Sequence, residues 1–154
     1  MNEPKTKTVL FVCTGNTCRS PMAVGLLRKL AGPDTYRILS AGTGASQGVP
    51  PSLYAKEVME EEGIDISGHR SQMLDGNMLE EADTVLVMAE THRRRVTDWF
   101  RSYAAKVRLL REFDPVKDDP DYPSIPDPMG QGKEAYVKCK EMIKRSLERA
   151  IHEL

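Results

Sequence analysis

The sequence predicts a single α/β domain, residues 1–154, built on a four-stranded parallel sheet with helices on both faces. Its 154 residues, 40% hydrophobic and 29% charged, suit one globular domain with its own core. Short apolar runs alternate along the chain with longer stretches of helical spacing, which is typical of a parallel sheet with helical crossovers. A polar, glycine-containing turn follows the first apolar run directly. Parallel sheets place ligands beyond the carboxyl ends of their strands, so this turn is the first candidate site.

Four short runs are predicted to be strands: residues 8–12, 36–41, 84–88 and 106–110. The first of them, TVLFV, is nearly all apolar, as expected of a strand that is buried on both faces. Five stretches with helical spacing separate and follow these strands. They are residues 21–31, 50–62, 74–82, 91–103 and 133–152, and an irregular segment covers 114–132.

The start of the first helix has a sequence signature of its own. Ser20 is predicted to be the N-cap and Pro21 the first helical residue, since proline is well tolerated there. The helix is expected to end at Gly32-Pro33. The stripe that it presents to the core contains Met22, Ala23, Leu26, Leu27 and Leu30.

Charge and hydropathy exclude several classes of function. A net charge of −1 gives no overall attraction to nucleic acid or to an anionic membrane. The longest apolar run near the start has four residues, too few for a signal or a membrane span, and an odd number of cysteines suits a reducing compartment. We therefore expect a cytoplasmic protein. The basic cluster 92–95 is predicted to be a solvated helix face, and docking of an acidic or phosphorylated partner is the alternative.

The turn VCTGNTCRSP, residues 12–21, admits several chemical interpretations. A metal clip is disfavoured because Cys13 and Cys18 lack a second pair of ligands, with Cys139 isolated and the three histidines unpaired in sequence. No Gly-Lys-Ser/Thr closes the turn, which excludes a Walker phosphate loop. We expect neither a metal ion nor a cofactor. A buried structural cysteine remains an alternative, although it explains few of the other residues.

A cradle for an anion explains more of the turn. A loop that leads into a helix N-terminus points backbone N–H groups at a bound anion. Gly15 permits close approach of the backbone, and Arg19 adds a planar fork for two phosphate oxygens. A cysteine among those N–H groups, here Cys13, has its thiolate stabilised and becomes a nucleophile.

The segment VCTGNTCRSPMA resembles the signature of the low-molecular-weight protein phosphatases: a strand, Cys-x5-Arg-Ser and a helix. Ser40-Ala41-Gly42-Thr43 is similar to the segment after the second strand of that family, and Gly68-His69-Arg70-Ser71 to its central loop. Asp127-Pro128, just before the last helix, is similar to its acid motif. The resemblance covers essentially the whole chain and implies a flavodoxin-like fold of three layers.

The resemblance implies a role for each residue of the turn. Cys13 attacks phosphorus and forms a phosphocysteine, Arg19 holds the equatorial oxygens, and Ser20 donates a hydrogen bond to the sulfur. Asn16 ties the loop to Ser40 and His69. The phosphate-binding loop then consists of Cys13, Thr14, Gly15, Asn16, Thr17, Cys18, Arg19 and Ser20.

A carboxyl group beside the cradle is needed as general acid. Three Asp-Pro pairs offer one, and Asp127 is preferred because its pair lies nearest the last helix, as in the family. Asp114 and Asp119 are interpreted as turn residues.

Two positions bear on which phosphorylated residue is cleaved. Relatives that act on phosphotyrosine usually have an apolar β-branched residue at the position of Thr17 and two aromatics after Asp-Pro, where this chain has Met129-Gly130. With Thr17 at this position, the loop resembles that of the bacterial protein arginine phosphatases instead. The hydroxyl of Thr17 suits a polar guanidinium, whereas a slot without aromatic walls would stack a tyrosine ring poorly. Gly44 departs from those relatives, which can present a bulky residue there.

We therefore expect phosphoarginine in proteins as substrate, with phosphotyrosine as the alternative. Arsenate reduction is a lesser alternative, because no cysteine lies in residues 70–100 to serve as a relay. Phosphorylated proteins are the expected partners, and anions such as phosphate, sulfate and vanadate are the expected inhibitors. A reversible bridge from Cys18 to an oxidised Cys13 is a further hypothesis, and simple packing of Cys18 is its alternative.

Overall fold

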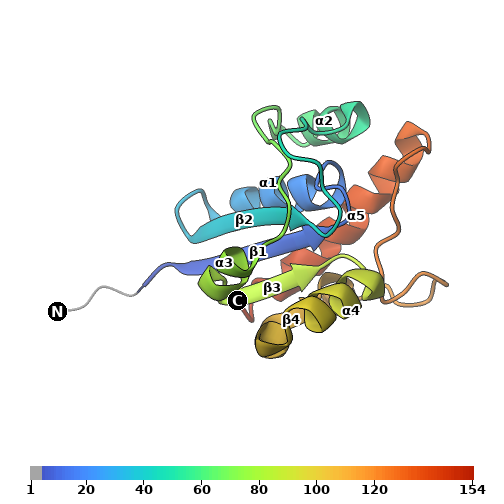
Figure 1. Cartoon of the computed structure of the whole chain (residues 1–154). Coiled ribbons are helices and arrows are strands. Elements are labelled where there is room, and N and C mark those ends of the chain that lie inside the picture. Colours follow the sequence, from blue (N-terminus) through green and yellow to red (C-terminus); the bar gives the residue numbers. More distant parts are fainter. Residues whose placement is uncertain (1–4) are drawn as a thin grey trace.

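A parallel sheet of four strands forms the centre of the protein (Figure 1). The computed structural model describes residues 5–154. The sheet order is β2-β1-β3-β4, and every neighbouring pair is parallel. The predicted fold class is confirmed, and all four predicted runs are strands. Their bounds are β1 Lys7–Cys13, β2 Tyr36–Gly42, β3 Thr84–Val87 and β4 Val107–Leu109.

Helices cover both faces of this sheet (Figure 1). The α-helices are α1 Arg19–Ala31, α2 Leu53–Glu60, α3 Gly76–Glu81, α4 Glu90–Trp99 and α5 Lys133–Ala150. Two 3₁₀ helices, η1 Arg101–Lys106 and η2 Leu110–Phe113, flank β4. Residues 114–132 contain no helix or strand, as predicted.

The alternation of side chains along β1 divides the core in two. Val9 and Phe11 pack with α1, α2 and α5 in one cluster. Leu10 and Val12 pack with Leu79 of α3 and with α4 in the other. Because β1 lies between two other strands and is covered on both faces, it is apolar at almost every position.

Several predicted helix ends are wrong. Helix α1 begins at Arg19, so Ser20 is not its N-cap and makes no capping hydrogen bond. The hydroxyl of Ser20 contacts Cys13 and Asn16 instead, and Pro21 still lies in the first turn, where a missing N–H is tolerated. Leu30, predicted to face the core, is 36% exposed.

The other corrections shorten helices. Helix α2 ends at Glu60 and is followed by a turn to Gly63, whose φ is 74°. Helix α3 begins only at Gly76, because Asp75 caps it through the N–H of Met78. Helix α4 ends at Trp99, where Phe100 adopts an extended φ of −135° and packs into the core.

The carboxyl ends of the strands place three loops together. Cys13 at the end of β1 lies opposite Gly42 of β2, and Val12 lies opposite Val87 of β3. The turn after β1, the loop after β2 and the start of α4 therefore share one edge of the sheet. No helix within residues 5–154 is long and apolar enough to cross a membrane.

Candidate active site

Backbone amides of neighbouring segments donate hydrogen bonds to the carbonyl groups of the turn between β1 and α1. The amides of Thr43 and Gly44 donate to the carbonyls of Cys13 (2.9 Å) and Thr14 (3.0 Å), and the amide of Ser52 donates to Thr17 (3.0 Å). Gly42 allows this approach, since a Cβ there would lie 2.2 Å from the Thr14 carbonyl oxygen.

The backbone N–H groups of the same turn remain available. Those from Gly15 to Cys18 have no acceptor among the residues that the structure describes. The turn also leads into the N-terminus of α1, whose dipole favours negative charge. An anion cradle at this position therefore has donors to bind with.

Asn16 is the centre of a hydrogen-bond network that shapes the turn. Its φ of 58° lies in the left-handed region, which costs a non-glycine residue free energy. Its Nδ2 donates to Ser20 Oγ (2.7 Å) and Ser40 Oγ (3.1 Å), and its Oδ1 accepts from the Gln72 amide (3.0 Å). His69 Nε2 donates to its carbonyl at 2.6 Å. These four contacts hold the left-handed conformation.

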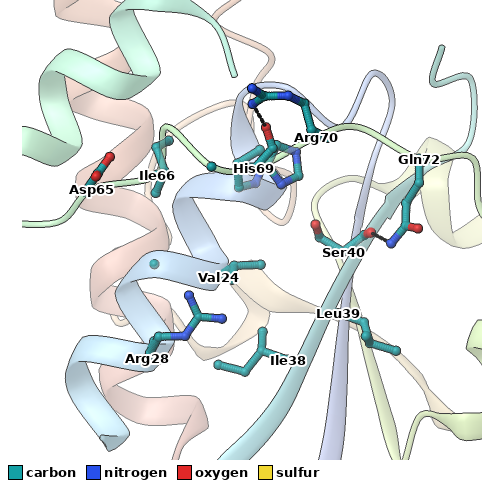
Figure 2. Close-up of a pocket in the computed structure, with 13 residues that line it drawn as sticks. Val24, Arg28, Ile38, Leu39, Ser40, Asp65, Ile66, His69, Arg70 and Gln72 are labelled. Atoms are coloured by element: carbon teal, nitrogen blue, oxygen red, sulfur yellow. Dashed lines mark hydrogen bonds between the residues drawn. The ribbon is translucent and has the colours of Figure 1, made fainter. Parts of the chain in front are cut away.

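His69 is neutral in this network. Burial is the main cause that lowers its pKa, and the nearby charge of Arg70 lowers it further. The contact with the Asn16 carbonyl then places the single ring proton on Nε2. Figure 2 shows His69 and Ser40 on two sides of a hollow of about 350 Å³ between α1, β2 and residues 65–72. This hollow lies behind the turn, and Cys13 is not in its wall.

The sulfur of Cys13 is buried and has a hydroxyl beside it. Ser20 Oγ lies 2.9 Å from Cys13 Sγ, and both residues are at most 2% exposed. Because the same hydroxyl accepts a hydrogen bond from Asn16, its own hydrogen is free to point at the sulfur.

Arg19 links the turn to the segment before the last helix. Its Nη1 donates to the carbonyl of Ile125 (3.0 Å), whose amide in turn donates to the Met88 carbonyl beyond β3 (2.7 Å). Its Nη2 lies 3.7 Å from Asp127 Oδ2. Arg19 is 4% exposed, whereas the side chain of Asp127 is 47% exposed. Asp127 is thus a carboxylate at the mouth of the cradle.

The other two Asp-Pro aspartates are engaged elsewhere. Asp119 pairs with the buried Arg111, which lowers the pKa of Asp119 to about 2. Asp114 is fully buried between Arg111 and Arg145, with Arg145 Nε 2.9 Å from its Oδ1. Hydrogen bonds from Arg145 and Val116 outweigh burial and lower the pKa of Asp114. Both carboxylates also accept local amide hydrogen bonds, as turn residues do.

The rim of the cradle is small and not aromatic. Thr17 Oγ1 and the Met129 methyl group lie 3.6 and 4.0 Å from the point where a Cβ on Gly15 would stand. The space above Cys13 is lined by Cys13, Gly15, Thr17, Cys18, Arg19, Asp127 and Met129. No ring is among these seven residues. Within residues 5–154, no cluster of three or more His, Cys, Asp or Glu side chains is arranged to hold a metal ion.

The family model described as "Low molecular weight phosphotyrosine protein phosphatase" matches residues 8–154, which include the whole site. The chain belongs to this family. It is a protein phosphatase, a hydrolase, and its fold is that of solved structures of the family.

The names of the relatives of this phosphatase assign them to different phosphorylated residues. It is 39% identical over 92% of both chains to a probable low molecular weight protein-tyrosine-phosphatase, EpsP, of Ralstonia solanacearum. It is 35% identical over 95% of both chains to a protein-arginine-phosphatase of Geobacillus stearothermophilus. A solved mutant of the YwlE arginine phosphatase with a phosphorylated active-site serine superposes with a TM-score of 0.85. That chain is 30% identical, and the match covers 96% of this chain and 95% of the other.

His92 of this phosphatase is a residue whose place the sequence does not reveal. The basic cluster 92–95 predicted a solvated face, but His92 is only 2% exposed and its Nε2 lies 2.8 Å from Thr14 Oγ1. The prediction is wrong for His92 because α4 begins at the edge of the sheet where the cradle lies, so its first turn faces inward. The available signal was the strand before it, which ends at the same edge as β1.

Proposed function

We propose that this phosphatase hydrolyses phosphoarginine in proteins through a phosphocysteine intermediate on Cys13. The observation that carries the choice of substrate is the rim above Cys13, which holds the hydroxyl of Thr17 and no aromatic ring. A tyrosine ring would find no aromatic side chain to stack on there. A guanidinium is polar and planar, and a hydroxyl is a suitable partner for it.

In the first step the Cys13 thiolate attacks phosphorus, and the bond from phosphorus to the guanidinium nitrogen breaks. Asp127, protonated, gives its proton to the departing nitrogen, and its place at the mouth of the cradle supports this role. The free N–H groups from Gly15 to Cys18, together with Arg19, stabilise the charge on the phosphoryl oxygens.

In the second step water attacks phosphorus and the S–P bond breaks, which releases phosphate. Asp127, now ionised, accepts the proton of that water. The electron pair returns to Cys13 as a thiolate, and the hydroxyl of Ser20 at 2.9 Å stabilises it as it leaves. The relative with a phosphorylated active-site serine supports transfer of the phosphoryl group to this position.

Phosphorylated proteins are the proposed partners of the site. The same N–H groups and Arg19 bind any tetrahedral or trigonal-bipyramidal oxyanion of suitable size, so phosphate, sulfate and vanadate are proposed to inhibit. Arsenate reduction by a cysteine relay has little support. Cys139 lies inside α5, 3% exposed, and burial raises its pKa and so disfavours the thiolate.

The test compares kcat/KM for one peptide that carries either phosphoarginine or phosphotyrosine, with Cys13→Ser as the inactive control. We expect the phosphoarginine peptide to be preferred. Thr17→Ile should shift the ratio towards phosphotyrosine, whereas Thr17→Ser keeps the hydroxyl and should retain the wild-type ratio. If the wild type prefers the phosphotyrosine peptide, phosphotyrosine replaces phosphoarginine as the proposed substrate and the mechanism is kept. The name of the Ralstonia relative favours that outcome.

A further inference from the structure

We propose that His92 is a positioning residue of this phosphatase, which holds the guanidinium of Arg19 in its phosphate-binding orientation by fixing the hydroxyl of Thr14. The inference rests on the proposed function, because it assigns Arg19 to the phosphoryl oxygens. His92 Nε2 lies 2.8 Å from Thr14 Oγ1, and the same oxygen lies 3.4 Å from Arg19 Nη2. The three side chains form one chain of hydrogen bonds from α4 to the cradle.

The orientation of the Arg19 guanidinium depends on the contact between its Nη2 and Thr14 Oγ1. Nη1 is held by the carbonyl of Ile125, whereas Nη2 lies 3.7 Å from Asp127 Oδ2, a contact too long for a hydrogen bond. The contact of Nη2 with Thr14 adds a second point and defines the plane. Arginine can only donate, so Thr14 Oγ1 has to stay in place as an acceptor. His92 is the side chain that keeps it there.

The fold retains His92 at some cost in stability. The ring is 2% exposed, and its Nδ1 is buried without a hydrogen-bond partner among residues 5–154. A buried nitrogen that lacks a partner costs about 1–3 kcal/mol, which an apolar ring would avoid. The hydrogen bond of Nε2 is therefore the feature that distinguishes His92 from a packing residue.

The charge state of His92 also suits a position beside Arg19. Burial, together with the positive charges of Arg19 and Arg95, lowers the pKa of His92 to about 3. The ring is therefore neutral near pH 7 and does not repel the guanidinium. The start of α4 is itself tied to the acid segment, since the Glu90 amide donates to Ser124 Oγ at 3.1 Å. His92 is thus presented on a fixed element.

The test uses p-nitrophenyl phosphate, an aryl phosphate with a good leaving group, so turnover is followed without either phosphopeptide. His92→Phe keeps a ring and removes the hydrogen bond, whereas His92→Gln can place an amide near the position of Nε2. We expect His92→Phe to lower kcat about 3- to 10-fold, the worth of one neutral hydrogen bond, with a smaller change in KM. His92→Gln should recover most of the loss. His152→Phe, at an exposed histidine near the C-terminus, is the matched control.

A double-mutant cycle with Thr14→Val tests the route of the effect. If His92 acts through Thr14, His92→Phe causes no further loss of kcat once the hydroxyl is absent. Losses that multiply in the double variant would overturn the proposal, and so would a His92→Phe enzyme with wild-type kcat. An impaired but stably folded His92→Gln enzyme, with the melting temperature of the wild type, would also overturn it.

Two further measurements keep the result interpretable. If His92→Phe does not fold, His92→Asn takes its place, since its amide is too short to reach Thr14 and should show the same loss. Affinity for inorganic phosphate, measured by calorimetry, reads the orientation of Arg19 without turnover, and we expect it to weaken in His92→Phe. Wild-type enzyme that cleaves neither phosphopeptide would refute the proposed function, while phosphate affinity would still decide the role of His92.

Discussion

Ser20 Oγ lies 2.9 Å from Cys13 Sγ, and because Asn16 donates to the same oxygen, the hydroxyl hydrogen is free to be donated to a thiolate. The contact stabilises negative charge on the sulfur, so it matters most when Cys13 leaves the phosphoenzyme. Loss of this contact is therefore expected to affect hydrolysis of the phosphoenzyme.

Ser20→Ala should slow hydrolysis of the phosphoenzyme more than its formation. We expect kcat to fall by about 10- to 100-fold, because a hydrogen bond to a charged group contributes about 1.5–3 kcal/mol. Rapid-quench measurement should then show a larger burst of leaving group than in the wild type. Ser146→Ala, which removes a hydroxyl bonded within α5, is the control. An unchanged burst with an unchanged kcat would remove Ser20 from this role.

Asp127→Asn keeps the size of the side chain and removes the proton that the leaving group needs. We expect kcat/KM to fall by about 10²–10⁴-fold for a poor leaving group. Asp121→Asn, in the same irregular segment, is the control. Activity of Asp127→Asn near that of the wild type would mean that another carboxylate is the acid.

Arg111→Met should destabilise the segment that carries Asp127. Arg111 and Asp114 are fully buried, and Asp119, whose side chain is 31% exposed, also pairs with Arg111, so the substitution removes a buried cation from two carboxylates. We expect the free energy of unfolding in urea to fall by about 3–5 kcal/mol. Arg108→Met breaks an exposed pair with Glu153 and should change it by less than about 1 kcal/mol. Equal losses in the two variants would contradict this account.

His92 should make folding sensitive to acid. Its pKa is about 3 in the folded protein and about 6.5 in the unfolded chain, so the unfolded chain binds more protons between these values. The contribution of the neutral ring is fully present above pH 6.5 and is lost as the pH falls towards 3. Urea unfolding from pH 7 to pH 4 should therefore show a smaller loss of stability in His92→Phe than in the wild type. Parallel pH profiles would contradict a buried neutral ring.

Cys18 offers a test under oxidation. Its sulfur lies 3.3 Å from Ser52 Oγ and 3.5 Å from the Tyr136 hydroxyl, beneath the turn that holds Cys13. Mild peroxide should yield a Cys13–Cys18 disulfide that a thiol reductant reverses, as seen by mass spectrometry. Cys139→Ser is the control, since Cys139 is buried in α5. Sulfinic acid on Cys13 without a bridge would show that Cys18 only packs.

The strands and the cradle can be predicted from local sequence. The helix ends, and the contacts that side chains make with residues distant in sequence, cannot. The run of apolar residues in β1 predicts burial on both faces because each face meets its own layer of helices. Ser20 was predicted as an N-cap because the sequence cannot show that a cysteine seven residues earlier competes for its hydroxyl. The choice among three Asp-Pro pairs likewise depended on resemblance, and only the contacts of Arg111 and Arg19 distinguish their environments.

By itself the sequence determined the parallel α/β class and the loop with its cysteine and arginine, because periodicity and short motifs are local properties of the chain. The tertiary structure decided which distant side chains complete the site. Asn16 is held in a left-handed conformation by Ser40, His69 and the Gln72 amide, and His92 is turned inward from α4. These contacts join residues separated by 24 to 78 positions. They exist only because parallel strands bring the loops at their carboxyl ends to one edge of the sheet.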